Sequence, residues 1–284
     1  MTKYGVDEAI VYASTKDGLQ HAGLIIRPDE NRFPSAAVLW IHGSGMSFGS
    51  QPYVDLGRDV AARGLTFLTG NTRGHDGLAL MSRGDEIVAG GSAWELYEEA
   101  PLDISAWLDA LRALGVDRVA LAGHSLGGAK VVHFQAQQPD PRVAGIILAS
   151  PPVEIPEFPE RVALARQMVD TGRGEELLPH AAGTPPWNVV SARTVVSREL
   201  VIRPAFARVP GEPSIQNVRC PILAFYGTSE VATTEALDTI RRNAVNAECQ
   251  TETIQNADHD YTGRTREVAR TIVGWLRNLL PQAT

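Results

Sequence analysis

The chain has 284 residues, of which 44% are hydrophobic and 21% are charged, and its formal net charge at pH 7 is −7. This length and composition are typical of a globular enzyme with one large core or two modest ones. The acidic balance argues against nucleic-acid binding, which needs a basic surface. No stretch approaches the roughly 20 apolar residues of a membrane span, and the N-terminus lacks the apolar core of a signal peptide. We therefore expect a cytoplasmic protein with no membrane partner.

The two cysteines, Cys220 and Cys249, lie far apart in the sequence and have neither metal-ligand nor C-x-x-C spacing. Both occur in apolar, strand-like runs, so we expect them to be buried free thiols. No group of His, Asp and Glu has the spacing of a metal site either. The sequence therefore predicts neither a metal nor a cofactor.

The N-terminal half alternates between strand and helix patterns. Two alternating apolar runs at 9–13 and 19–26, joined by Asp17-Gly18, predict a β-hairpin. In chain order, the patterns then predict a strand at 36–41, a helix at 53–62, a strand at 65–69, an irregular glycine-rich segment at 76–97, a helix at 102–114, a strand from 118, a helix at 126–137 and a strand at 143–148.

The composition changes at residue 151, because ten of the 18 prolines fall between Pro151 and Pro213. Helical pieces at 159–169 and about 187–200 are embedded in this segment. Regular alternation then resumes with a strand at 221–226, a helix at 234–243, a strand at 249–254 and a final amphipathic helix at 265–280.

Strands that alternate with helices after an opening hairpin predict an α/β fold, with a mostly parallel central sheet covered by helices on both faces. We divide the chain into a first core part at 1–150, an insertion at 151–217 and a second core part at 218–284. The insertion lies between two strands at their C-terminal end, where ligands bind in open α/β sheets. We therefore expect it to be a lid over the site, the alternative being an inert surface elaboration.

The motif Gly123-His124-Ser125-Leu126-Gly127 joins a buried strand directly to a helix, which is the sequence form of a nucleophile elbow. Its glycines have no side chain to collide across the turn, so the Ser125 hydroxyl is expected to stand exposed above the sheet. A helix-capping serine is the structural alternative. A second copy, Gly45-Met46-Ser47-Phe48-Gly49, begins several residues after its strand, so we interpret Ser47 as a loop residue.

A serine hydroxyl attacks only when a base takes its proton. Of the seven histidines, His259 follows the last predicted strand. A loop there would lie at the same edge of the sheet as the elbow, which makes His259 the candidate base. The base needs a carboxylate that fixes its tautomer. Glu230, just after the strand at 222–226, fits the chain order serine, acid, histidine. Glu154 and Asp258 are the alternatives.

A tetrahedral intermediate also needs hydrogen-bond donors for its oxyanion. The backbone N–H of Leu126, directly after the candidate nucleophile, is one. The loop His42-Gly43-Ser44-Gly45 (the oxyanion loop) follows a buried strand, and its glycines let the backbone approach a substrate closely. We expect the backbone N–H of Ser44 to be the second donor.

Together these features resemble the α/β-hydrolase superfamily over nearly the whole chain. The resemblance is carried by the HG loop at His42-Gly43, the elbow at Ser125, the acid position at Glu230 and the pair Asp258-His259. It implies that His259 deprotonates Ser125, that the oxyanion binds the amides of the oxyanion loop and the elbow, and that water releases the acid. Glu230 departs from the aspartate usual in the family. The turn at 71–75 matches the family's R-G turn, which we interpret as structural.

We therefore expect a hydrolase that cleaves a small-molecule carboxylic ester. The same residues would also serve a thioester, lactone, amide or carbon–carbon bond, or acyl transfer, and a non-catalytic ligand-binding protein is a lesser alternative. Dehalogenases and epoxide hydrolases are disfavoured, because their elbow carries an aspartate. Apolar side chains of the loop at 46–48, the segment at 76–97 and the insertion are expected to line the pocket: Met46, Phe48, Trp94, Phe158 and Trp187.

Overall fold

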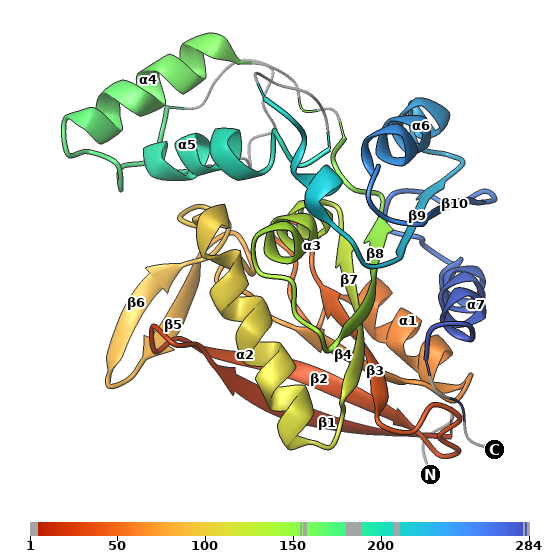
Figure 1. The fold of residues 1–284 in the computed structure, drawn as a ribbon. Coiled ribbons are helices and arrows are strands. Elements are labelled where there is room, and N and C mark those ends of the chain that lie inside the picture. Colours follow the sequence, from red (N-terminus) through yellow and green to blue (C-terminus); the bar gives the residue numbers. More distant parts are fainter. Residues whose placement is uncertain are drawn as a thin grey trace.

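The computed structural model describes residues 5–153, 155, 158–179, 189–206, 211–280 and 282. An eight-stranded sheet in the order β1-β2-β4-β3-β7-β8-β9-β10 forms the centre of the molecule (Figure 1). Its strands are β1 (Val6–Ser14), β2 (Gln20–Pro28), β3 (Ala36–Ile41), β4 (Thr66–Gly70), β7 (Arg118–His124), β8 (Val143–Ala149), β9 (Ile222–Gly227) and β10 (Cys249–Ile254). β2 pairs antiparallel with β1 and with β4, and the remaining pairs are parallel. The predicted α/β class and the opening hairpin are confirmed.

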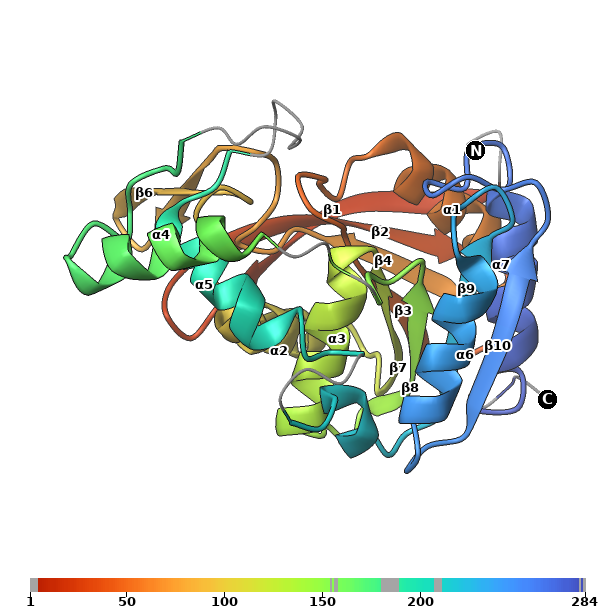
Figure 2. The same ribbon diagram turned by 90° about the horizontal axis from the view of Figure 1, so that it is seen from above.

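Helices cover both faces of this sheet (Figure 2). One face carries α1 (Gln51–Ala61) and α7 (Thr265–Leu276), and the other carries α2 (Ala100–Ala113), α3 (Leu126–Gln137) and α6 (Thr233–Asn243). Strand β3 shows why both faces need cover. Leu39 and Ile41 pack toward α2 and α3, whereas Val38 and Trp40 pack toward α1 and α7. A strand that is buried on both sides reads as a continuous apolar run, and this is the pattern seen in the sequence.

The segment at 76–97 is more regular than its sequence indicates. It contains a hairpin of β5 (Ala79–Arg83) and β6 (Glu86–Gly90), followed by the short 3-10 helix η1 (Tyr97–Glu99). One face of the hairpin buries Met81 against Leu19, whereas Leu80 and Ile87 on the other face are exposed. The expectation of an irregular segment is therefore wrong here. Each strand is short, and the apolar residues on both faces hide the alternation that identifies a strand.

The insertion contributes α4 (Pro159–Asp170), α5 (Ala192–Val201) and the 3-10 helix η2 (Ser214–Asn217). Figure 1 shows α4 and α5 side by side at one end of the molecule, beyond the sheet. They share a small apolar cluster that includes Ala165, Met168 and Val195. Helix α5 is docked onto the core where Ser197 Oγ accepts a hydrogen bond of 2.7 Å from the Tyr97 N–H. The helical insertion is thus present, and its role as a lid stays a prediction.

Within the described part of the chain, no helix combines the length and apolarity that crossing a membrane requires. Cys220 and Cys249 are both unpaired and partly buried.

Candidate active site

The elbow between β7 and α3 is a tight turn with Ser125 at its tip. Ser125 has φ 52° and ψ −126°, a strained conformation with positive φ that residues other than glycine rarely adopt. Its N–H donates to the Ala149 carbonyl at 2.9 Å. A Cβ on Gly123 would lie 2.3 Å from the carbonyl oxygen of Gly127, and one on Gly127 would lie 2.4 Å from that of Ile41. Both glycines are therefore required by space, as the motif suggests.

Glu230 and His259 form a hydrogen-bonded pair at the carboxyl end of the sheet. The Nδ1 atom of His259 lies 2.7 Å from Oε2 of Glu230. This hydrogen bond raises the pKa of His259 above its ordinary value of 6.5, against the opposing effect of burial. Because Nδ1–H donates to the carboxylate, the neutral ring keeps its lone pair on Nε2, which is the tautomer that a general base needs.

Three hydrogen-bond donors hold the Glu230 carboxylate. Besides His259, the Ser150 hydroxyl donates to Oε1 at 2.6 Å and the Gly227 N–H donates to the same oxygen at 2.8 Å. Ser150 in turn lies 2.6 Å from the Tyr261 hydroxyl. Burial alone would raise the pKa of Glu230, but its donors stabilise the anion and hold the pKa below its usual value. The acid is thus kept ionised and fixed in orientation.

Ser125, Glu230 and His259 line one cavity of about 200 Å³. The rest of its wall comes from the chain after β8, from the end of β9, and from the turn before α6 and the first residues of that helix. These residues are Ser150, Pro151, Pro152, Val153, Tyr226, Val231, Ala232, Glu235 and Ala236. The three residues predicted as nucleophile, acid and base, which are far apart in sequence, therefore meet at one pocket.

The predicted oxyanion donors lie on the two segments that meet at the elbow. Leu126 opens α3 directly after Ser125. The loop of His42, Gly43 and Ser44 lies beside Ser125, as a Cβ built on Gly43 would be only 3.1 Å from the Cβ of Ser125. The His42 ring donates from Nδ1 to the Gly43 carbonyl at 2.8 Å. The backbone of this loop is therefore held in place next to the candidate nucleophile.

A second buried histidine connects the oxyanion loop to the loop of the candidate base. The Gly43 N–H donates to the Tyr53 hydroxyl at 3.1 Å, and that hydroxyl donates to Nδ1 of His124 at 2.8 Å. His124 then donates from Nε2 to the carbonyl oxygen of His259 at 2.8 Å. Burial lowers the pKa of His124 to about 4, so the ring is neutral at pH 7. His124 is buried and is not among the residues that line the cavity.

Ser47 and Asp258, two of the alternatives that the sequence offers, have other surroundings. Ser47 lies in the loop between β3 and α1 and is not among the residues that line the described cavity. The Asp258 carboxylate accepts the N–H of Thr262 at 2.8 Å. Glu154 lies outside the described residues.

Met46, Phe48, Trp94 and Phe158, the described apolar residues predicted for the pocket, are not among the lining residues of this cavity. The Phe48 N–H donates to the Asn71 side chain, and the Trp94 ring donates to the Glu175 carbonyl in the insertion. Met46 packs against the core on the α1 side, and Phe158 is exposed just before α4. Trp187 is outside the described residues. Their part in substrate binding stays a prediction.

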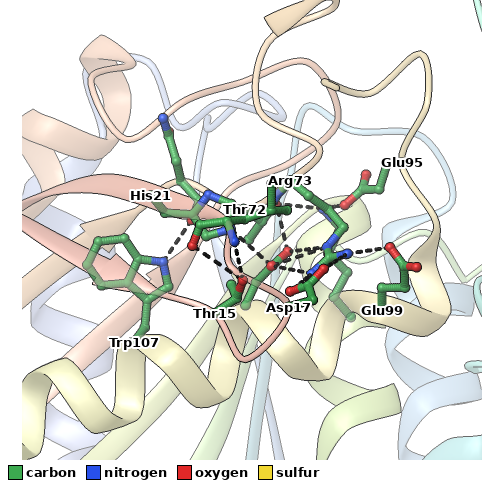
Figure 3. Close-up of polar contacts among 12 residues, drawn as sticks. Thr15, Asp17, His21, Thr72, Arg73, Glu95, Glu99 and Trp107 are labelled. Atoms are coloured by element: carbon green, nitrogen blue, oxygen red, sulfur yellow. Dashed lines mark hydrogen bonds and ion pairs between the residues drawn. The ribbon is translucent and has the colours of Figure 1, made fainter. Parts of the chain in front are cut away.

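The R-G turn is anchored by a buried ionic cluster (Figure 3). The Asp103 carboxylate accepts hydrogen bonds of 3.0 Å from the guanidinium of Arg73 and from Nε2 of His21. Burial would raise the pKa of Asp103, but His21 and Arg73 hold it well below its usual range. Arg73 also pairs with Asp17 and Glu99. These contacts agree with the structural interpretation of the turn.

Several residues of the site are absent from the sequence-based prediction. Ser150 and Tyr261 support the acid, and Tyr53 joins the two loops. Ser150 does follow a buried strand at the edge where the elbow lies, so a polar residue at that position was a usable signal. Tyr53 lies in a helical pattern with nothing that marks its hydroxyl, and only the fold reveals its contacts.

Residues 38–271 match the model of the Alpha/beta hydrolase family. The chain belongs to this family. The match extends from β3 to the middle of α7, and so includes every residue of the candidate site described above.

Known proteins resemble this α/β hydrolase in sequence over a short segment and in fold over most of the chain. A segment of 55 residues is 40% identical to a phospholipase, YtpA, of Bacillus subtilis, and it spans 19% of the chain and 21% of the phospholipase. The fold is similar to that of Est1E from Butyrivibrio proteoclasticus, solved with ferulic acid bound, with a TM-score of 0.66 at 19% identity over 95% of this chain and 98% of the other. A monoglyceride lipase of Saccharomyces cerevisiae gives a TM-score of 0.67 at 14% identity over 95% of both chains.

Proposed function

We propose that this α/β hydrolase is a serine esterase that cleaves a carboxylic ester through an acyl-serine intermediate. The observation that carries the proposal is the meeting of Ser125 with the hydrogen-bonded pair of His259 and Glu230 at one cavity. The strained backbone of Ser125 adds support, since strain of this kind clusters at functional sites.

In the acylation step, Oγ of Ser125 attacks the ester carbonyl carbon while Nε2 of His259 takes the hydroxyl proton. The oxygen of the former carbonyl becomes an oxyanion and accepts hydrogen bonds from the backbone N–H groups of Ser44 and Leu126. His259 passes its proton to the departing alkoxide, and the alcohol leaves. Water then attacks the acyl-serine with the same base, and the acid is released.

The carboxylate of Glu230 has two tasks in this mechanism. It holds the imidazole of His259 in the tautomer whose Nε2 is free to accept a proton. It also stabilises the imidazolium that forms in the transition state, because a fixed anion lies 2.7 Å from the ring nitrogen.

The wall of the cavity favours a small apolar substituent on the substrate. Pro151, Pro152, Val153, Val231 and Ala236 are among its lining residues, and its volume is about 200 Å³. The structural neighbours include a protein with bound ferulic acid, an esterase and a monoglyceride lipase, which supports an ester as substrate. We therefore propose a small-molecule ester as substrate and do not invoke a cofactor.

The test is labelling with a fluorophosphonate, followed by mass spectrometry of the modified peptide. We expect modification of Ser125 that is lost in S125A and strongly slowed in H259A. Labelling of Ser47 instead would contradict the assignment, and S47A is the matched control. Folded protein that is not labelled at all would favour a non-catalytic ligand-binding protein.

A panel of esters, thioesters, lactones and amides with one acyl group would then identify the bond. We expect the highest kcat/KM for an ester of a small alcohol. A clear preference for a thioester, lactone or amide would refute the ester assignment and leave the serine mechanism intact.

A further inference from the structure

Lys130 is a buried cation one turn into the helix that begins at the elbow. Its side chain is fully buried, and its ammonium forms an ion pair with Glu95, which is also buried. The same ammonium donates a hydrogen bond of 3.2 Å to the hydroxyl of Thr72 and lies 5.7 Å from the centre of the Tyr97 ring. Nothing in the proposed mechanism uses this charge.

The hydrogen bonds that begin at Lys130 run in one direction. An ammonium can only donate, so the Thr72 oxygen accepts, and its own hydrogen is left for Nε2 of His42 at 3.0 Å. The Thr72 N–H lies 3.0 Å from the same nitrogen, so Nε2 is an acceptor in either case. A neutral ring that accepts at Nε2 must carry its hydrogen on Nδ1. Burial, and next the charge of Lys130, hold the pKa of His42 well below its usual range, so the ring is neutral.

The chain of hydrogen bonds ends on the peptide that carries the proposed oxyanion donor. His42 donates from Nδ1 to the Gly43 carbonyl at 2.8 Å. This carbonyl and the N–H of Ser44 belong to one planar peptide unit, and no peptide bond in the described residues is cis. In a trans unit the two groups point in opposite directions. Fixing and polarising the carbonyl therefore fixes and polarises the N–H as well.

We propose that Lys130 is a positioning residue of the oxyanion hole, which acts through Thr72 and His42 on the peptide between Gly43 and Ser44. The inference rests on the proposed function, because it assigns a role in stabilising the negative charge that forms on the substrate. Lys130 does not touch the substrate in this proposal. It sets the orientation and donor strength of the Ser44 N–H through hydrogen bonds to the opposite side of the same peptide.

The surroundings of Glu95 support a functional origin for the buried pair. A Cβ on Gly74 would lie 2.1 Å from the Glu95 carboxylate, so the glycine of the R-G turn leaves the space that the carboxylate fills. Buried ion pairs contribute little net stability, because desolvation offsets the attraction. A role in orienting the chain of hydrogen bonds explains why the two charges are present under the elbow helix.

The decisive comparison is between T72V and T72S. T72V removes the hydroxyl link at nearly constant volume and keeps the ion pair, whereas T72S keeps the hydroxyl. Complete loss of an oxyanion donor costs about 10²- to 10³-fold in kcat, so weakening one is expected to lower kcat about tenfold, with KM changed less than about twofold. T72S is expected to restore most of this loss.

T69V is the matched control, since Thr69 is fully buried in β4 and its hydroxyl has no hydrogen-bond partner among the described residues. It should leave kcat unchanged. An aryl trifluoromethyl ketone gives a readout that packing alone would not move, because its adduct with Ser125 places an oxyanion in the same hole. Its Ki should rise in T72V by the same factor by which kcat/KM falls.

The double variant K130M/E95Q removes both charges together, so neither member of the ion pair is left buried without the other. It should lose kcat to a similar extent as T72V, measured on protein whose thermal unfolding shows a folded state. If it does not fold, the comparison between T72V and T72S decides alone.

Failure of the inference and failure of the proposed function give different results. Wild-type protein that is labelled at Ser125 and hydrolyses esters, while T72V behaves like T69V, overturns the inference alone. Full kcat in folded K130M/E95Q overturns it too. Wild-type protein that is neither labelled nor hydrolytic overturns the proposed function, and the inference falls with it.

Discussion

Replacing Glu230 by glutamine tests the proposed site most directly. The Gly227 N–H and the Ser150 hydroxyl both donate to Oε1, at 2.8 and 2.6 Å. The amide oxygen of glutamine must take that place, since an NH₂ group there would face two donors. The NH₂ group then faces Nδ1 of His259, which must accept and carry its hydrogen on Nε2. This tautomer cannot take the serine proton, so kcat is expected to fall on the order of 10⁴-fold.

The assay is steady-state hydrolysis of a chromogenic ester, with active sites counted by fluorophosphonate labelling. E230D keeps the charge but shortens the side chain by one methylene, so it should lose less activity than E230Q. E154Q is the comparison for the alternative acid and should retain near wild-type kcat. A loss of less than about tenfold in E230Q would refute the reasoning, because a base held in the wrong tautomer costs far more than that. A large loss in E154Q would transfer the role to Glu154.

Further predictions concern the pH profile, the support of the acid and the stability of the fold. Because Glu230 raises the pKa of His259 above 6.5, wild-type kcat/KM should rise with pH through an apparent pKa above that value, and E230Q should move this limb to lower pH. S150A removes one of the carboxylate's donors and should lower kcat about tenfold at neutral pH, as measured on the same ester. D103N leaves the Arg73 guanidinium without its buried anion and should lower the free energy of unfolding by about 3–5 kcal/mol in urea titrations, with unchanged stability contradicting the ionic anchor. The lowered pKa of Asp103 also means that its stabilisation is present above pH 3.8 and is lost as the pH falls further.

The fold and the candidate nucleophile, acid and base can be predicted from the sequence because both leave local patterns. Continuous apolar runs predict β3 and β8 as strands buried on both faces, and the structure has them at Ala36–Ile41 and Val143–Ala149. The elbow motif needs glycines at fixed positions, so Ser125 is visible without any knowledge of its neighbours. Glu230 and His259 could be chosen because each follows a strand, and parallel strands end at one edge of the sheet.

The residues that support the site leave no such pattern. Lys130 lies in a helical run as an ordinary lysine would, and its burial depends on Glu95, a residue in a segment whose sequence shows no regular period. Tyr261 contacts Ser150 across 111 positions of sequence. Contacts of this kind are set by how the layers pack, which periodicity within one element does not report. The β5–β6 hairpin leaves no clear pattern for a related reason. Both of its faces carry apolar residues, but only one face packs against the rest of the protein.

The distribution of charge around Ser125 unites the proposed mechanism with the inferred role of Lys130. Acylation separates charge, because the imidazole of His259 becomes positive as the substrate oxygen becomes negative. On one side, the Glu230 anion lies behind the imidazole. On the other, the Lys130 cation is connected by hydrogen bonds through Thr72 and His42 to the peptide between Gly43 and Ser44. Both fixed charges thus favour the transition state over the neutral ground state, and neither has to move as the reaction proceeds. On this argument, removing either charge should affect kcat more than KM.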